Sequence, residues 1–229
     1  MTTIIISDTH LTARFNHKKY RYLQKIFSQA DRVILNGDFW DGYATSFEKF
    51  VNSPWKNLFP ILKRKKTIYI YGNHDTEKMS DQRRSLFSDR QLERLEIVFG
   101  NKKLILEHGN KISPAFNDRI PKFLVLKIFV HIWQLFNFLA FKILGKNYYY
   151  FNKRRNIKMK KWMHDNLSKN SYLFCGHSHV AEMNLALRYA NTGFIRYGYG
   201  HYIKIQNKKI SLVSERYLLD VYGFEKVVK

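Results

Sequence analysis

The chain has 229 residues, of which 45% are hydrophobic and 16% are aromatic. This composition excludes a disordered chain, and the length favours one domain, over residues 1–229, with a full hydrophobic core. Cys175 is the one cysteine, which excludes an intramolecular disulfide and is typical of a reducing compartment. The N-terminal residues have no basic segment and only a short apolar run. We therefore expect no signal peptide and a cytoplasmic protein.

The charge is strongly unbalanced. Forty Lys and Arg against eighteen Asp and Glu give a formal net charge of +22. A surplus of this size indicates an anionic partner, which can be nucleic acid, anionic lipid head groups or a phosphate-bearing substrate. The charge alone does not choose among these partners.

Five short apolar runs, at residues 3–7, 32–35, 67–71, 103–107 and 171–175, predict buried strands. A helix is predicted over residues 18–29, and the C-terminal part predicts short strands around a turn at 206–209. Each of the five runs ends at or beside a cluster of Asp, Asn or His. Because ligands bind at the carboxyl ends of strands in α/β sheets, we expect the five clusters to converge on one site.

The clusters are Asp8-Thr9-His10, Gly37-Asp38-Phe39-Trp40-Asp41, Gly72-Asn73-His74-Asp75, His108-Gly109 and Gly176-His177-Ser178-His179. In order and spacing they resemble the five motifs of the calcineurin-like metallophosphoesterase family, and the resemblance extends over residues 3–193. It implies an α/β fold in which a four-layer β-sandwich is flanked by helices. It also implies an enzyme that hydrolyses phosphoester or pyrophosphate bonds.

The resemblance further implies a centre of two divalent metal ions. Asp38 would bridge the ions; the remaining ligands are Asp8, His10 and His179 for one ion, and Asn73, His108 and His177 for the other. Two cations about 3.5–4 Å apart need a bridging carboxylate and open positions for water and substrate. Mixed oxygen and imidazole ligation favours Mn(II), with Fe or Zn as alternatives.

His74 and Asp41 are the predicted catalytic residues. In the family, the histidine of the Gly-Asn-His motif protonates or stabilises the leaving oxygen, and the second Asp of the Gly-Asp motif orients that imidazole. A carboxylate partner also keeps the imidazole cationic, as a general acid requires.

The residues outside the motifs are expected to have other roles. We expect no part in the site for His17, His131 and His164, whereas His201 follows Gly200 on a late strand and could approach it. Cys175 ends a predicted strand, and we interpret it as a small buried apolar residue rather than a ligand.

A segment at about 111–170 is inserted between the His108 and His177 motifs. It contains thirteen Lys or Arg and two Asp, a net charge of +11, which is half of the surplus of the whole chain. Residues 123–144 are mostly apolar, and their few polar side chains (Lys127, His131, Gln134, Asn137 and Lys142) fall on one arc of a helix.

Three interpretations of the apolar stretch remain open. A transmembrane helix would carry two Lys near its middle, at about 2.5–3.5 kcal/mol for each central Lys. The second interpretation is an ordinary helix packed on the core. The third is an amphipathic lid that lies at a membrane interface or shapes an apolar channel beside the metals, and the aromatic and basic residues that follow favour it.

With this insertion, the chain is similar to the UDP-2,3-diacylglucosamine hydrolases of lipid A synthesis, a branch of the same superfamily. These peripheral enzymes of the inner membrane carry a helical lid for acyl chains, and they cleave the UDP pyrophosphate to release UMP. The resemblance implies a lipid-linked substrate and a peripheral location on the inner face of the cell membrane. One difference is that many members of the branch have Arg at the position of His74.

The sequence features also bear on three other functions. The charge and the many Tyr and Phe would also suit a nuclease or nucleotide phosphodiesterase, although a continuous apolar helix suits it poorly. A protein phosphatase is disfavoured because Gly42-Tyr43 follows Asp41 and Asp75 follows His74, where those enzymes have Arg-Gly and Glu. A non-catalytic scaffold is disfavoured because every expected ligand is present. The oligomeric state is left open.

Overall fold

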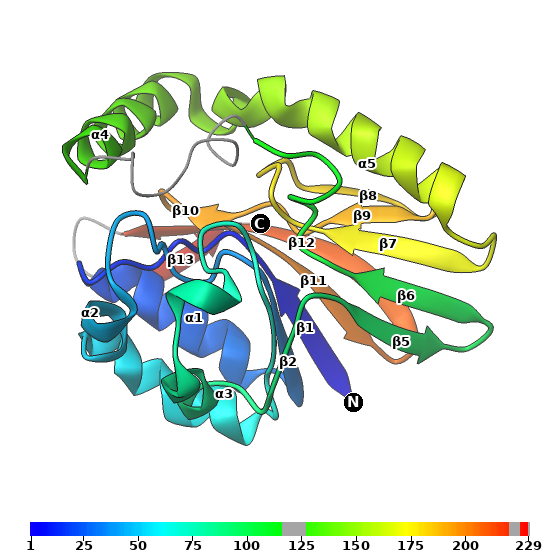
Figure 1. Cartoon of the computed structure of the whole chain (residues 1–229), viewed down its shortest axis with the longest axis horizontal. Helices are drawn as coiled ribbons and strands as arrows, with labels where there is room; N and C mark the ends of the chain where they lie inside the picture. The colour runs from blue at the N-terminus through cyan, green and yellow to red at the C-terminus, as the bar shows by residue number, and fades with distance from the viewer. Residues whose placement is uncertain (116–126, 220–224, 229) are drawn as a thin grey trace.

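The computed structural model of the chain describes residues 1–115, 127–219 and 225–228. Two β-sheets pack against each other, and helices cover the outer face of each sheet (Figure 1). The predicted four-layer arrangement of a β-sandwich flanked by helices is confirmed.

In the described residues, the larger sheet has eight strands in the order β13-β12-β11-β1-β2-β3-β4, with β10 paired to β11. Strands β1 to β4 run parallel, and β1 pairs antiparallel with β11. The bounds are β1 Thr2–Ile6, β2 Arg32–Asn36, β3 Ile68–Ile70, β4 Arg90–Leu92, β10 Ile195–Arg196, β11 Tyr199–Gln206, β12 Lys209–Leu219 and β13 Glu225–Val228. Three of the five predicted strands therefore lie side by side in this sheet.

The smaller sheet has five strands within the same described ranges, in the order β5-β6-β7-β9-β8. Its bounds are β5 Leu95–Phe99, β6 Lys102–Leu106, β7 Ser171–Cys175, β8 Glu182–Asn184 and β9 Tyr189–Asn191. Strands β6, β7 and β9 run parallel, while β5 and β8 pair antiparallel at the edges. The other two predicted strands are β6 and β7. The five predicted strands thus belong to two sheets rather than to one.

Strand β1 shows why its sequence is apolar at consecutive positions. Ile5 faces the second sheet, where it joins a core that includes Ile34 and Phe174. Ile4 and Ile6 point the opposite way, into the core beneath the helices. A strand that is covered on both faces has to be apolar on both, so its hydrophobic residues follow one another without alternation.

The helices on the larger sheet lie in the connections between its parallel strands. Their bounds are α1 His17–Ser28, α2 Phe47–Val51, α3 Phe59–Arg64 and the 3₁₀ turns η1 Pro54–Leu58, η2 Glu77–Met79 and η3 Gln82–Leu86. Helix α1 begins one residue earlier than predicted because the side chain of Asn16 caps its N-terminus, accepting hydrogen bonds from the backbone N–H groups of Lys18 and Lys19.

The inserted segment forms the helical cover of the smaller sheet and extends beyond it (Figure 1). It comprises α4 Lys127–Leu144, the 3₁₀ segment η6 Gly145–Asn152 and α5 Lys153–Asn166. Helix α5 packs on the sheet through Met159 and Met163, which contact Leu173 and Tyr189. Residues 123–126 of the predicted apolar helix lie outside the described residues.

Candidate metal centre

The carboxyl ends of β1, β2, β3, β6 and β7 meet at one end of the sandwich and bring the five motifs together. Backbone hydrogen bonds hold the first two loops side by side: Asp8 N donates to Gly37 O at 3.1 Å, and His10 N donates to Asp38 O at 2.9 Å. On the other sheet, Gly176 N donates to His108 O at 3.0 Å. The site therefore lies across the junction of the two sheets.

Five of the predicted site residues have a backbone conformation that non-glycine residues rarely adopt. They have positive φ angles, of 52° at Asp8, 45° at His10, 53° at Asp38, 66° at His177 and 59° at His179. Each costs about 1–2 kcal/mol relative to an ordinary conformation. Strained backbone conformations of this kind cluster at functional sites, where they direct side chains toward a common point.

Asp8, His10 and His179 form one group. His179 Nε2 lies 3.0 Å from Asp8 Oδ1 and 3.1 Å from His10 Nε2. His10 Nε2 is also 3.8 Å from Asp8 Oδ1. These atoms lie close enough together to bind a single ion, and the grouping agrees with the first predicted ligand set.

Asp38, Asn73, His108 and His177 form the second group. Asp38 Oδ2 lies 3.2 Å from His108 Nε2, and Asn73 Oδ1 lies 3.2 Å from the same nitrogen and 3.0 Å from His177 Nδ1. Asp38 Oδ2 is also 3.6 Å from His10 Nε2, in the first group. Asp38 therefore lies between the two sets of predicted ligands, as a bridging carboxylate must.

The chemistry of this donor set fits two divalent cations. His108 donates from Nδ1 to Asn36 O at 2.9 Å, and His177 Nε2 lies 2.9 Å from Ser113 O, so the opposite nitrogen of each ring faces Asn73 and the other predicted ligands. Asp8 Oδ1 is buried and makes no hydrogen bond within the described part of the chain. Carboxylate and amide oxygens with neutral imidazoles are ligands for Mn, Fe or Zn.

The electrostatics of the pocket also favour cations. Burial opposes a charge on His108, but the carboxylates of Asp38 and Asp8 outweigh it and raise the pKa of this imidazole to about 10. The same negative potential attracts a metal ion. Burial and the charge of His108 lower the pKa of His177 to about 3, so that its imidazole is neutral, the form that coordinates metals.

Asp75 is a residue of the site for which the sequence analysis predicted no role. Its buried carboxylate accepts hydrogen bonds from Gly72 N at 2.7 Å, Asp38 N at 3.0 Å and Phe39 N at 2.6 Å. It therefore ties the loop after β3 to the loop after β2. Asp75 directly follows His74 in the sequence, and an acidic residue buried at the end of a strand is the signal that could have revealed this role.

His74 and Asp41 lie beside the first group. His74 Nδ1 is 3.0 Å from Asp41 Oδ1, and the rings of His74 and His10 meet edge to face with centroids 4.5 Å apart. Burial opposes the cationic form of His74, but the charges of Asp38 and Asp41 and the hydrogen bond to Asp41 outweigh it and raise the pKa to about 9. The imidazole of His74 is therefore cationic at neutral pH, the form that the predicted general acid requires.

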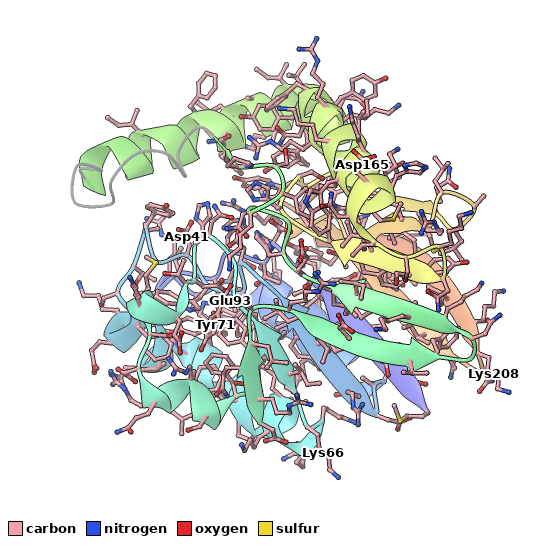
Figure 2. All side chains as sticks on the ribbon, turned by 45° about the vertical axis from the view of Figure 1, so that its right-hand side comes forward. Asp41, Lys66, Tyr71, Glu93, Asp165 and Lys208 are labelled. Carbon is pink, nitrogen blue, oxygen red and sulfur yellow. The ribbon has the colours of Figure 1, made fainter. Side chains whose placement is uncertain are left out.

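The inserted segment reaches the site through Tyr149 and Arg155. The ring of Tyr149, on η6, packs edge to face on His179 with centroids 4.7 Å apart. Arg155, on α5, places Nη1 3.0 Å from His177 Nε2. Figure 2 shows Asp41 on the side of the molecule that faces α4. Neither Tyr149 nor Arg155 could be expected at the site from the sequence, because residues in an insertion have no motif to mark them.

His17, His164, His201 and Cys175 belong to neither of the two groups. His201 packs against Phe194, at 5.1 Å between ring centroids, and its Nδ1 is 2.9 Å from Ser214 Oγ. His164 is exposed beside Asp165, and His17 packs on Phe15. The side chain of His131 lies outside the described residues. Cys175 is fully buried against Met159 and Leu173, which confirms that it is a small core residue.

Helix α4 carries apolar side chains on its outer side. Ile132, Leu135, Phe136, Leu139 and Ile143 recur at helical spacing, and each is at least half exposed. We call these five residues the outer stripe. On the opposite side, Phe141 is buried against Phe194 and Tyr149. None of the helices in the described ranges, α4 included, is long and apolar enough to cross a membrane.

The fold and the arrangement of the site agree with a comparison of the sequence with known families. A family model described as the calcineurin-like phosphoesterase superfamily domain matches residues 1–202. The chain belongs to this superfamily. It is therefore a hydrolase that acts on phosphoester bonds, and its family uses divalent metal ions. No curated protein matches the phosphoesterase.

Solved structures share the fold of this phosphoesterase at low sequence identity. Vps29 from Entamoeba histolytica, solved in complex with zinc, is 14% identical with a TM-score of 0.53, covering 100% of this chain and 97% of its own. Vps29 from Cryptosporidium parvum is 13% identical with a TM-score of 0.51, covering 99% and 95%. The E. coli phosphoesterase Yfce is 16% identical with a TM-score of 0.48, covering 93% and 98%.

Proposed function

We propose that this phosphoesterase hydrolyses a phosphoester or diphosphate bond in a lipid-linked substrate, with UDP-2,3-diacylglucosamine as the first substrate to test. The observation that carries the proposal is the outer stripe of α4, the helix whose inner side packs on Tyr149 and Phe194 beside the metal centre. An exposed apolar face of this kind binds acyl chains or a bilayer surface.

Helix α4, which carries the outer stripe, is connected to the site by a short chain of aromatic contacts from its inner side. Phe141, on the inner side of α4, packs on Phe194 with ring centroids 5.9 Å apart, and Phe194 lies 6.0 Å from His179. The outer stripe lies on the far side of α4 from Phe141, across a helix about 10 Å in diameter, so an acyl chain would reach it by extending past the helix. The aromatic rings around His179 would also exclude water from the reacting groups.

Basic residues on the next helix, α5, supply the complementary charge. Lys153, Arg154, Lys158 and Lys161 are exposed on α5, which follows α4 in the chain. A wide apolar face beside a basic cluster is typical of proteins that lie on anionic membranes. We therefore propose a peripheral location on the cytoplasmic face of the cell membrane.

The proposed roles in the reaction follow from the geometry. Two divalent ions, for which manganese is our first choice, would be held by the seven predicted ligands: Asp8, His10, Asp38, Asn73, His108, His177 and His179. When bound, the ions supply a water activated for attack on phosphorus and positive charge for the phosphate oxygens. His74 donates its proton to the leaving oxygen, and Asp41 holds that imidazole cationic and correctly oriented.

The first experiment measures UMP release from UDP-2,3-diacylglucosamine in detergent by Mn(II)-loaded protein, beside hydrolysis of bis-p-nitrophenyl phosphate. We expect UMP release that falls by about 100-fold or more in His74→Ala, the usual effect of removing a general acid. Turnover of the small diester alone would reject the lipid substrate and keep the phosphoesterase. Salt-sensitive cleavage of single-stranded DNA would favour a nuclease instead.

The role of the outer stripe is tested by the double variant Leu139→Ser/Ile143→Ser. We expect it to lower kcat/KM for the acylated substrate about tenfold or more, because two large apolar contacts are lost. Hydrolysis of bis-p-nitrophenyl phosphate should stay the same. Val98→Ser is the matched control, since Val98 is 80% exposed on β5, in the smaller sheet. An equal loss with both substrates would contradict acyl binding by α4.

A further inference from the structure

Arg196 lies beside the metal centre on the short strand β10. The backbone N–H of Ile195, its neighbour, donates to Asp8 O at 3.3 Å, which holds β10 against the first metal-binding loop. Phe194, two residues before Arg196, packs against both His179 and Tyr149. Arg196 is therefore fixed to the same loops that position the predicted ligands.

The guanidinium of Arg196 has no anionic partner among the described residues, where it makes no ion pair and no hydrogen bond. It is half-buried over the ring of Tyr197, 4.9 Å from the centroid. Asp41 is in electrostatic range of it, but that carboxylate is already engaged. Its Oδ1 is 3.0 Å from His74 Nδ1, and its Oδ2 is 3.8 Å from His10 Nδ1. A half-buried guanidinium that makes no hydrogen bond within the described residues keeps its N–H donors for an anionic ligand.

A second cation lies in the same region. The buried ammonium of Lys19 donates a hydrogen bond to Thr9 O and forms no ion pair within the described ranges. Burial, and after it the charge of Arg196, hold the pKa of Lys19 well below its ordinary value. Asp41 is the carboxylate that acts on both cations.

Arg196 also acts on the residues around His74. Burial and the charge of His74 lower the pKa of His10, and the charge of Arg196 adds to this effect. Ile195 and Phe194, which precede Arg196, contact Asp8 and His179 of the first ligand set, beside which His74 lies, whereas Arg155 contacts His177 on the side of the second ligand set. In our assignment His74 faces the leaving oxygen, so an anion bound by Arg196 belongs to the leaving group.

We propose that Arg196 binds a phosphate of the leaving group, so that the site prefers diphosphate-linked substrates to simple phosphodiesters. In this reaction one water molecule is consumed, and its oxygen bonds to the attacked phosphorus. The bond from that phosphorus to the bridging oxygen breaks, and the bridging oxygen keeps the electron pair. The products are two phosphate monoesters, one of which leaves in contact with Arg196. The assignment of the leaving side rests on the proposed function.

The test compares two non-hydrolysable probes, methylenediphosphonate and methylphosphonate, in calorimetric titrations of metal-saturated protein. We expect Arg196→Gln to weaken binding of the diphosphonate about 10- to 100-fold, as for loss of hydrogen bonds between charged groups. Binding of methylphosphonate should change by less than about threefold, which is the size of effect expected from losing a charge at an exposed surface. Arg196→Lys should restore part of the difference, because it keeps the charge but not the bidentate geometry.

Arg188→Gln is the matched control, since Arg188 bonds to the backbone of Ser168 away from the site and its loss removes the same charge. Circular dichroism and metal content establish that each variant is folded and loaded. Equal weakening of both probes, or no weakening of either, would overturn the proposal. Because binding is measured without turnover, a protein that hydrolyses no phosphoester would refute the proposed function and still show whether Arg196 selects the diphosphonate.

Discussion

The imidazole of His74 and the carboxylate of Asp41 lie 3.0 Å apart, between Nδ1 and Oδ1. The carboxylate is itself fixed by the backbone N–H groups of Tyr43 and Ala44, at 3.2 and 3.3 Å. His74 is fixed from its other side, because its backbone N–H donates to Asp38 Oδ1 at 2.9 Å. His74, the predicted proton donor, is thus bonded both to Asp41, which orients it, and to Asp38, the carboxylate between the two sets of predicted ligands.

The first prediction concerns pH. The pKa of His74 is raised to about 9, so the imidazole keeps its proton at neutral pH and loses it as the pH rises through that value. Asp41→Asn removes a charge and a hydrogen bond that favour the cation, so the pKa of His74 should fall. We expect kcat to decrease about 100-fold at pH 8, in the range for general acid catalysis. The alkaline limb of the pH–rate profile should move to lower pH.

The control for this prediction is Asp89→Asn, which removes an exposed carboxylate that pairs with Lys63. Its pH–rate profile should match that of the unmodified protein. A lower kcat in Asp41→Asn with an unchanged alkaline limb would mean that Asp41 acts on the structure of the loop rather than on the proton of His74.

The second prediction concerns the metals. Ions that bind the folded state at 100 times their Kd stabilise it by about 2.7 kcal/mol, so Mn(II) should raise Tm by roughly 5–10 °C in a chain of this size. Metal analysis should find two ions per chain. Asp38→Asn should lose most of the Tm increase, because Asp38 lies between both sets of predicted ligands. A full increase in that variant would exclude Asp38 as the bridge.

The third prediction concerns Gly37, which has a φ of +85° and no room for a side chain. A Cβ there would lie 2.3 Å from His108 Nδ1. Gly37→Ala should therefore displace His108, lower the metal content and destabilise the fold by more than about 2 kcal/mol. Gly100→Ala is the control, since Gly100 also has a positive φ but nothing within 4 Å of its Cβ. Gly100→Ala should cost about 1 kcal/mol in urea unfolding and leave the metals bound.

The fourth prediction concerns the attachment of α4. Phe141 is 4% exposed and packs on Phe194, Tyr149 and Tyr199. Phe141→Ala should loosen α4 from the site and make it more sensitive to limited proteolysis, at a cost of up to about 3–5 kcal/mol if the cavity does not collapse. Ile143→Ala, on the same helix but 82% exposed, should be cleaved at the unmodified rate. Equal cleavage of both variants would show that Phe141 does not attach the helix.

Much of the site could be predicted from strand ends. His108 and His177 are 69 positions apart in the numbering, yet each follows a short apolar run, and the structure places both beside Asn73. These residues could be selected from the sequence because buried strands and polar loops differ strongly in local composition. Asp75, Arg155 and Arg196 were not assigned roles, because a buried anchor or an arginine on an edge strand has the same local sequence as an ordinary loop residue.

The outer stripe shows the same limit in the inserted segment. The sequence predicted an amphipathic helix there, but its polar arc did not indicate which face would meet the protein. In the structure, Phe141 is buried while Leu139 and Ile143 are exposed. Periodicity measures the angle between side chains on one helix, whereas the buried face depends on which surface the helix packs against.

The sequence by itself determined the strands, the order of the motifs and the identity of the predicted ligands, because these depend on short-range patterns of apolar and polar residues. Only the tertiary structure decided that the ligands come from two sheets, that Asp38 lies between the two sets, and that Arg196 and Tyr149 approach them. These relations depend on how the two sheets pack together. Packing is set by contacts between residues far apart in the chain, which no local pattern records.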